Sequence, residues 1–94
     1  MRTGIEAITR ERIDQLERLE FTVQYDVEHN NDGELLMAVY ALIDEDGRGN
    51  FDLFPAGWDD NRCMHMLSKP YKERLAIAGA LIAAEIDRLE AVKE

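Results

Sequence analysis

The sequence has 94 residues, of which 46% are hydrophobic, and it carries a formal net charge of −9. This length is enough for one domain with a modest core, and the hydrophobic content excludes a disordered chain. No uncharged apolar run approaches the roughly 18 residues of a membrane-spanning helix, so we expect no membrane segment and a single helical domain over residues 1–94.

The N-terminal residues and the cysteine content indicate the cytoplasm. Arg2, Glu6 and Arg10 lie where a signal peptide would have its apolar core, so no signal peptide is expected. Cys63 is the single cysteine, and the chain therefore cannot form an internal disulfide, which suits a reducing compartment.

Negative charge is concentrated in the middle of the chain. Between Leu19 and Asn61 the sequence holds eleven acidic residues and one basic residue, Arg48, whereas the remaining residues are nearly neutral. Such a surface repels phosphate backbones, so direct nucleic-acid binding is not expected. It suits a basic partner or a divalent cation, and the alternative is a solvated surface that keeps the protein soluble.

The first predicted helix begins near Gly4, because Thr3 and Glu6 form the Ser/Thr-x-x-Glu pattern of a capping box. Apolar residues continue at roughly helical spacing, and the helix is predicted to end near Glu20. Residues 21–27 then alternate strictly between apolar and polar side chains, which predicts a short strand or an extended segment.

Three more helices are predicted after this segment. Residues 35–43 are apolar throughout and indicate a buried helix, and a loop rich in Gly and Asp follows at 44–58. A short helix capped by Asp59 or Asp60 should reach about residue 67, and Pro70 then favours the start of a helix that ends near Val92. The predicted fold is therefore mainly α, a small bundle of about four helices with a short extended or β segment after the first.

The last predicted helix carries two kinds of surface. One stripe repeats at intervals of four and three residues, and it consists of Leu75, Gly79, Ile82, Ile86 and Leu89. The centre of the helix, residues 76–84, is apolar all round, so the first two helices should enclose it. Small residues in this centre would also let another helix, or a second subunit, approach closely.

Five polar residues offer ligands for a divalent metal. They are Asp26, His29, Asp32, Glu34 and Glu85. Metal-dependent, all-helical nucleotide pyrophosphohydrolases of the MazG type use E-x-x-E on one helix and E-x-x-D on another. Here the residue three positions after Glu34 is Met37, and the residue three positions after Glu85 is Arg88, so the second acidic residue of each pair is missing. The alternative assigns Glu34 to helix capping and Glu85 to an ion pair with Arg88. We expect no cofactor, with a divalent metal held by Asp26, His29, Glu34 and Glu85 as the alternative.

The acidic loop is the second candidate site. Residues 44–52 are similar to the start of an EF-hand calcium loop, although the fifth position is Arg48 and the twelfth is Pro55. The alternative is an acidic loop in which Asp and Gly serve the turns. Trp58 is either a lid over the core or an interface anchor. The residues predicted to interact with a partner are Asp44, Asp46, Trp58, Asp59 and Asp60.

Several spaced motifs resemble those of a known family. They are Asp26-x-x-His29, Gly33-Glu34-Leu35-x-x-Ala38-x-Tyr40-Ala41, Pro55-x-x-Trp58-Asp59, Lys69-Pro70, and A-G-A-L-I-x-A-E-I-x-R-L over residues 78–89. Together they resemble a family of short proteins encoded by tailed bacteriophages and prophages, over about residues 10–90. The sequence departs from that family at 63–66, where Cys-Met-His-Met replaces a tryptophan-rich stretch. The resemblance implies a phage origin, and with it the cytoplasm of the host cell, but no settled activity.

No intact catalytic motif is found, so no catalytic residue is predicted. We expect a non-enzymatic phage or prophage accessory protein that binds a host or phage protein with a basic surface, or a small ligand, as counter-defence proteins do. A homo-oligomer is expected. The enzymatic alternative is a divergent metal-dependent nucleotide pyrophosphohydrolase of the MazG type, and a third reading is a structural role in the virion.

Overall fold

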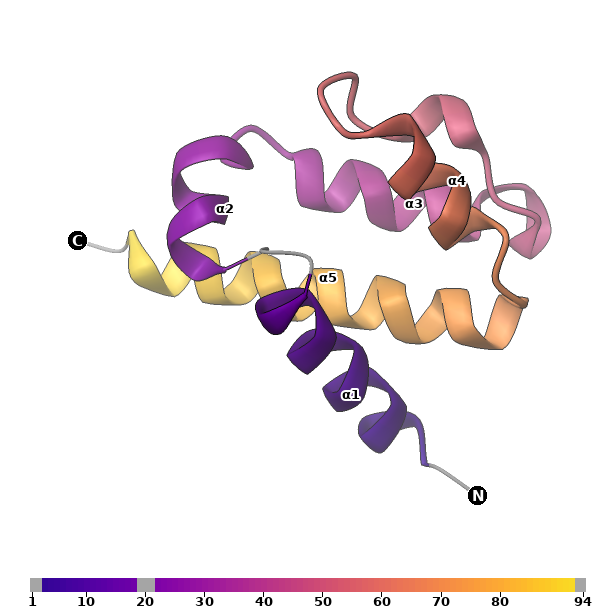
Figure 1. Ribbon diagram of the computed structural model, residues 1–94, viewed down its shortest axis with the longest axis horizontal. Coiled ribbons are helices and arrows are strands. Elements are labelled where there is room, and N and C mark those ends of the chain that lie inside the picture. The colour runs from indigo at the N-terminus through magenta and orange to yellow at the C-terminus, as the bar shows by residue number, and fades with distance from the viewer. Residues whose placement is uncertain (1–2, 19–21, 93–94) are drawn as a thin grey trace.

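The C-terminal helix α5 (Tyr71–Ala91) is the element on which the rest of the fold packs, and Figure 1 shows it extending across the molecule. The computed structural model describes residues 3–18 and 22–92. The other helices are α1 (Gly4–Glu17), α2 (Val23–His29), α3 (Glu34–Gly47) and α4 (Asp60–Leu67), and a short 3-10 helix, η1, spans Phe51–Leu53. Over these described ranges the chain has no strand, so the mainly α fold is confirmed.

Most helix boundaries lie where the local chemistry places them. At the start of α1, Thr3 Oγ1 accepts a hydrogen bond from Glu6 N at 3.1 Å, and Glu6 Oε1 accepts one from Thr3 N at 3.2 Å. These two bonds form the predicted capping box. Asp59 caps α4 by accepting hydrogen bonds from the first turn, and α5 starts directly after Pro70.

The extended segment predicted for residues 21–27 is not observed. Residue 21 lies outside the described part of the chain, and Val23–His29 form helix α2, which makes five α-helices rather than about four. Thr22 caps this helix, since its hydroxyl oxygen accepts a hydrogen bond from Tyr25 N at 3.1 Å. The buried side chains of α2 are Asp26 and, at its C-cap, Asn30. Because polar rather than apolar residues face the interior, the alternation of apolar residues predicted the wrong element.

The core lies between α3 and α5, which run side by side in Figure 1. The fully buried side chains of this core include Leu35, Leu42 and Leu81. Alanines occupy much of the interface, as expected for the small-residue centre of α5, and Ala80 and Ala84 are fully buried. This packing orients α3 so that its C-terminal end meets the first turn of α5.

Helix α1 crosses α5 at Gly79. A Cβ atom on Gly79 would come within 2.6 Å of Ile8 Cδ1, so the glycine is what permits this close approach. Near the other end of α1, Arg12 forms an ion pair with Asp87 at 3.0 Å. No helix in the described ranges is long and apolar enough to cross a membrane.

Candidate functional site: a pocket at the end of α3

The regular part of α3 ends at Ile43, where the backbone turns sharply. Asp44 is extended, with φ −62° and ψ 166°, and Glu45 and Asp46 are left-handed, with φ values of 55° and 57°. A left-handed conformation costs a non-glycine residue on the order of 1 kcal/mol. The surrounding structure must therefore hold this acidic turn in place.

Backbone hydrogen bonds and one buried arginine hold the turn. Gly49 N donates to Asp44 O at 2.8 Å, and Asn50 N donates to Ala41 O at 2.7 Å. Arg74, which is buried, donates from Nη1 to Leu42 O at 2.7 Å. These bonds satisfy carbonyl groups that the end of α3 would otherwise leave without partners, so they fix the position of the acidic turn relative to α5.

Two glycines make room for this arrangement. Gly47 and Gly49 have φ values of 89° and 86°, which glycine adopts without strain. A Cβ atom on Gly47 would come within 2.8 Å of the ring of Tyr71, so this ring lies directly against the turn. The guanidinium carbon of Arg74 lies 5.4 Å from the centre of the same ring.

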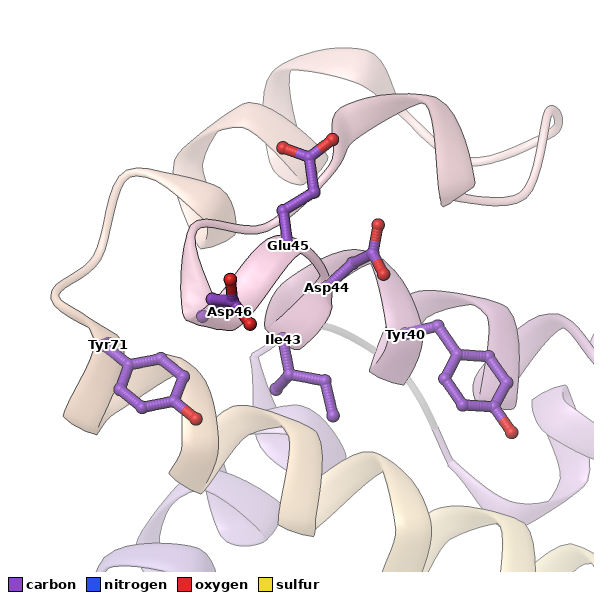
Figure 2. A pocket seen from close by; sticks show the side chains of 7 residues that line it. Tyr40, Ile43, Asp44, Glu45, Asp46 and Tyr71 are labelled. Carbon is purple, nitrogen blue, oxygen red and sulfur yellow. The ribbon is translucent and has the colours of Figure 1, made fainter.

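The turn and the two neighbouring helices form a surface pocket of about 690 Å³. Its lining residues are Tyr40, Ile43, Asp44, Glu45, Asp46, Gly47 and Tyr71. Figure 2 shows the two tyrosines on opposite sides of the turn, with Asp46 toward Tyr71, Asp44 toward Tyr40 and Glu45 projecting away from both rings. We call this site the tyrosine pocket.

The tyrosine pocket combines two groups that attract cations. Carboxylates attract a positive charge directly, and the faces of aromatic rings attract it through their quadrupole. Tyr40 is 57% exposed, whereas the 47% exposed ring of Tyr71 already lies against Gly47 and the Arg74 guanidinium. The pocket can therefore attract a basic side chain or a small organic cation, with the carboxylates of the turn and the more exposed ring of Tyr40 as the contacting groups.

The four residues predicted as metal ligands are not arranged as one metal site. Asp26, Glu34 and Glu85 do lie near one another, around the guanidinium of Arg88, with which all three interact electrostatically. His29 is exposed, its Nδ1 lies 3.2 Å from Tyr25 O, and its ring stacks on that of Tyr25 with 4.3 Å between centroids. Glu34 Oε1 accepts a hydrogen bond from Asp32 N at 2.7 Å. Glu85 accepts hydrogen bonds from Arg88 at 2.7 Å and 3.1 Å. Among the described residues, no group of three His, Cys, Asp or Glu side chains could hold a metal ion.

Asp26, the fourth of these residues, belongs to a buried polar network. Its Oδ1 accepts a hydrogen bond from Asn30 Nδ2 at 2.7 Å, and Asn30 Oδ1 accepts one from Trp58 Nε1 at 3.1 Å. Asp26 Oδ2 is buried without a hydrogen-bond partner. Burial raises the pKa of this carboxyl, while the hydrogen bond from Asn30 and the charges of Arg12 and Arg88 oppose the rise. The network ties α2 to the loop before α4.

Trp58, Asp59 and Asp60, three of the five residues predicted to contact a partner, have mainly local contacts. Trp58 is half-buried, packs against the core and has its ring centroid 6.5 Å from that of Phe54. Asp59 Oδ1 accepts hydrogen bonds from Asn61 N and Arg62 N at 2.8 Å and 3.3 Å. Asp60 is exposed in the first turn of α4. Of the five predicted interaction residues, only Asp44 and Asp46 line the tyrosine pocket.

No local sequence pattern points to the two tyrosines of the pocket. Tyr40 and Tyr71 lie 31 positions apart, and neither belongs to a local motif that marks a binding site. The signal that could have found them is the pair Gly47 and Gly49 after an acidic run, because it marks a turn that returns the chain to α5.

Comparison with known proteins adds no further constraint. No protein-family model, curated protein or solved structure matches the chain. The resemblance to the phage family thus stays a prediction, and the function has to be argued from the geometry of the tyrosine pocket.

Proposed function

We propose that this chain is a non-enzymatic binding protein whose tyrosine pocket takes an arginine or lysine side chain from the basic surface of a partner protein. The observation that carries the proposal is that Asp44 and Asp46 line one surface pocket together with Tyr40 and Tyr71. A guanidinium group is planar, so it can stack on an aromatic face while it donates hydrogen bonds to a carboxylate. The same chemistry would take a small organic cation.

The distribution of charge supports a basic partner. Eleven acidic residues and a single basic one lie between residues 19 and 61, and every residue that lines the pocket except Tyr71 belongs to this segment. An acidic surface raises the rate at which a basic protein approaches, by long-range attraction that salt weakens. With the sequence resemblance to phage proteins, this leads us to propose a phage accessory protein that occupies a host protein, as a counter-defence inhibitor would.

The hydrolase alternative gains no support from the site. A MazG-type enzyme needs acidic side chains that share a metal, whereas Glu34 and Glu85 are each engaged in a local hydrogen bond and His29 lies on the surface. No observation favours the virion role, so we take neither further.

A hexa-arginine peptide is a suitable probe, because it offers the proposed side chain without assuming a partner. We expect the amide resonances of residues 40–47 and 71 to shift when the peptide is added to the isotope-labelled protein. A hexa-glutamine peptide should shift none of them. Shifts spread evenly over all acidic segments, including α2, would mean that the pocket has no special role.

Three variants separate the pocket from the general charge. Asp46→Asn should weaken peptide binding roughly fivefold to tenfold, and its left-handed backbone suits asparagine, so the fold should persist. Glu28→Gln makes the same charge change on the exposed face of α2 and should weaken binding less than twofold. Tyr40→Leu should weaken it about twofold to fivefold, the value of an exposed cation–π contact. Equal losses for Asp46→Asn and Glu28→Gln would refute the proposal.

A further inference from the structure

A stripe of half-exposed apolar side chains runs along α5 with the spacing of a coiled-coil seam. Leu75, Ile82, Ile86 and Leu89 are 44–56% exposed. They follow a repeat of four and three residues whose remaining position, Gly79, is covered by Ile8 of α1. A strict 4-3 repeat defines a narrow seam suited to a partner helix, and it is narrower than the face that a helix normally turns to its own core. The core-facing side of α5 is instead lined by Ala80, Leu81 and Ala84. We call the four exposed side chains, Leu75, Ile82, Ile86 and Leu89, the α5 stripe.

Helix α3 extends this apolar surface. Met37 is 41% exposed and lies one turn before Tyr40, which lines the tyrosine pocket together with Tyr71 at the start of α5. Tyr40 itself is left to the pocket and is not counted in this surface. At roughly 200 Å² for each full side chain, Met37 and the α5 stripe expose on the order of 500 Å². A specific interface buries about 800 Å² per partner with its polar rim included, so the area matches one side of a dimer.

We propose that a second copy of this chain covers the α5 stripe, with the two α5 helices antiparallel and the two-fold axis near Ile82. The charges beside the stripe select this direction. Lys72 and Glu90 are eighteen residues apart, which is five helical turns, so they lie on the same flank of the helix, and both are exposed. In an antiparallel pair, Lys72 of each copy lies opposite Glu90 of the other, and Leu75 lies opposite Leu89.

A parallel pair would bring like charges together. The Lys72 and Glu90 flanks would then lie on opposite sides of the pair and make no contact, and the acidic turns at Asp44–Asp46 would meet at one end of the dimer, since this turn lies against Tyr71 in each copy. In the antiparallel pair the turns lie at opposite ends of helices that are each about 31 Å long, at 1.5 Å per residue. Since each chain carries a net charge of −9, this separation favours the antiparallel arrangement.

The first experiment measures mass in solution by sedimentation or light scattering. The native chain should have twice its 10.8 kDa mass at a concentration of about 100 μM. Ile82→Glu would place two carboxylates at the axis and should weaken the dimer at least a hundredfold. Met64→Glu makes the same change at a 54% exposed residue of α4 and should leave the dimer intact. A native chain of single mass at several hundred micromolar overturns the proposal, and so does equal dissociation of the two variants.

The second experiment tests the direction of the helices. Lys72→Glu should weaken the dimer roughly tenfold, because two symmetric attractions become repulsions. Adding Glu90→Lys to that variant should restore the native affinity. A parallel dimer would respond to neither change. In a third arm, Ile82→Cys should form an intermolecular disulfide on mild oxidation, and Cys63 is buried and need not be replaced. Failure of both the charge swap and the cross-link overturns the antiparallel geometry. None of these arms depends on the tyrosine pocket.

Discussion

The strongest prediction about the tyrosine pocket concerns Gly49, which lies where the chain leaves the acidic turn. Gly49→Ala meets two separate penalties. Its φ of 86° is left-handed, and the new Cβ atom would clash with Leu67 Cδ1 and come within 3.1 Å of Ala41 O and 3.2 Å of Arg74 Nη1. Ala41 O accepts the hydrogen bond from Asn50 N that closes the turn, so this backbone contact cannot relax without loss of the bond.

Gly33 offers a matched control, because only one of the penalties applies there. Its φ is 85°, and a Cβ atom would meet nothing within 4 Å. Gly33→Ala should therefore cost about 1 kcal/mol for the left-handed backbone alone. Gly49→Ala adds the steric term of overpacking, about 2 kcal/mol more, for a total of about 3 kcal/mol.

Thermal unfolding followed by circular dichroism separates the two cases. For a chain of this size, each 1 kcal/mol lowers Tm by roughly 4–8 °C. We expect a loss of about 5 °C for Gly33→Ala and about 15 °C or more for Gly49→Ala. Equal losses for the two variants would show that the contacts of Gly49 with Ala41 and Arg74 do not determine the turn, and our account of how the pocket is held would be wrong.

Three further variants test other contacts. Gly79→Ala should cost about 1–2 kcal/mol because its Cβ would lie 2.6 Å from Ile8 Cδ1, and the loss should shrink in an Ile8→Val background, as measured by chemical denaturation. Arg74→Met removes the donor to Leu42 O and should cost about 2–3 kcal/mol, with a parallel loss of hexa-arginine binding in the titration described above. Trp58→Phe leaves buried Asn30 Oδ1 without its indole donor and should cost about 1–3 kcal/mol, a value that unfolding curves can check. A change below about 0.5 kcal/mol would show that this hydrogen bond contributes little to stability.

Much of the helical architecture was predictable because local chemistry determines it. The capping box of Thr3 and Glu6 marked the start of α1, Asp59 marked α4, and Pro70 marked α5. Helix α2 was missed because apolar and polar side chains alternate along its sequence, which is typical of a strand. This alternation indicates a strand only when the apolar side chains face the core. Here Asp26 and Asn30 are buried, and their hydrogen bond to each other replaces apolar packing. That information lies in tertiary contacts and not in the local pattern.

The pocket was predictable only in part, for a related reason. The acidic residues Asp44 and Asp46 were identified from charge, but the tyrosines that complete the site come from two helices brought together by Arg74 and Gly47. The 4-3 repeat of α5 was also visible in the sequence. The sequence pattern did not reveal which of the two apolar faces of α5 turns toward the core. The face with small residues does so, because it lets α3 and α1 approach α5 more closely than leucine or isoleucine would allow.

The buried carboxyl of Asp26 yields a prediction about pH. Its side chain is fully buried, with Asn30 on its own helix, Arg12 approaching from α1, and Glu85 and Arg88 from α5. Burial is the largest influence and raises the pKa of Asp26 above its ordinary value, and Glu85 raises it further, whereas Asn30, Arg12 and Arg88 lower it. When the folded-state pKa of an acid is raised, the folded protein binds the proton more tightly than the unfolded chain does. The contribution of Asp26 to stability is therefore greatest below its unfolded pKa of about 3.9 and is lost as the pH rises through the raised folded pKa.

Asp26→Asn isolates this effect, because an amide keeps the acceptor for Asn30 Nδ2 and does not ionise. We expect the variant to be more stable than the native protein at pH 7, with the difference shrinking as the pH falls toward 4. The assay is chemical denaturation at several pH values, and the comparison between the two proteins cancels the titration of all other groups. A variant that is less stable than the native chain at pH 7 would mean that Arg12 and Arg88 stabilise the ionised carboxylate by more than burial costs. The network would then be a buried ion-pair cluster, and Asp26 Oδ2 would have to be paired through contacts that form only in solution.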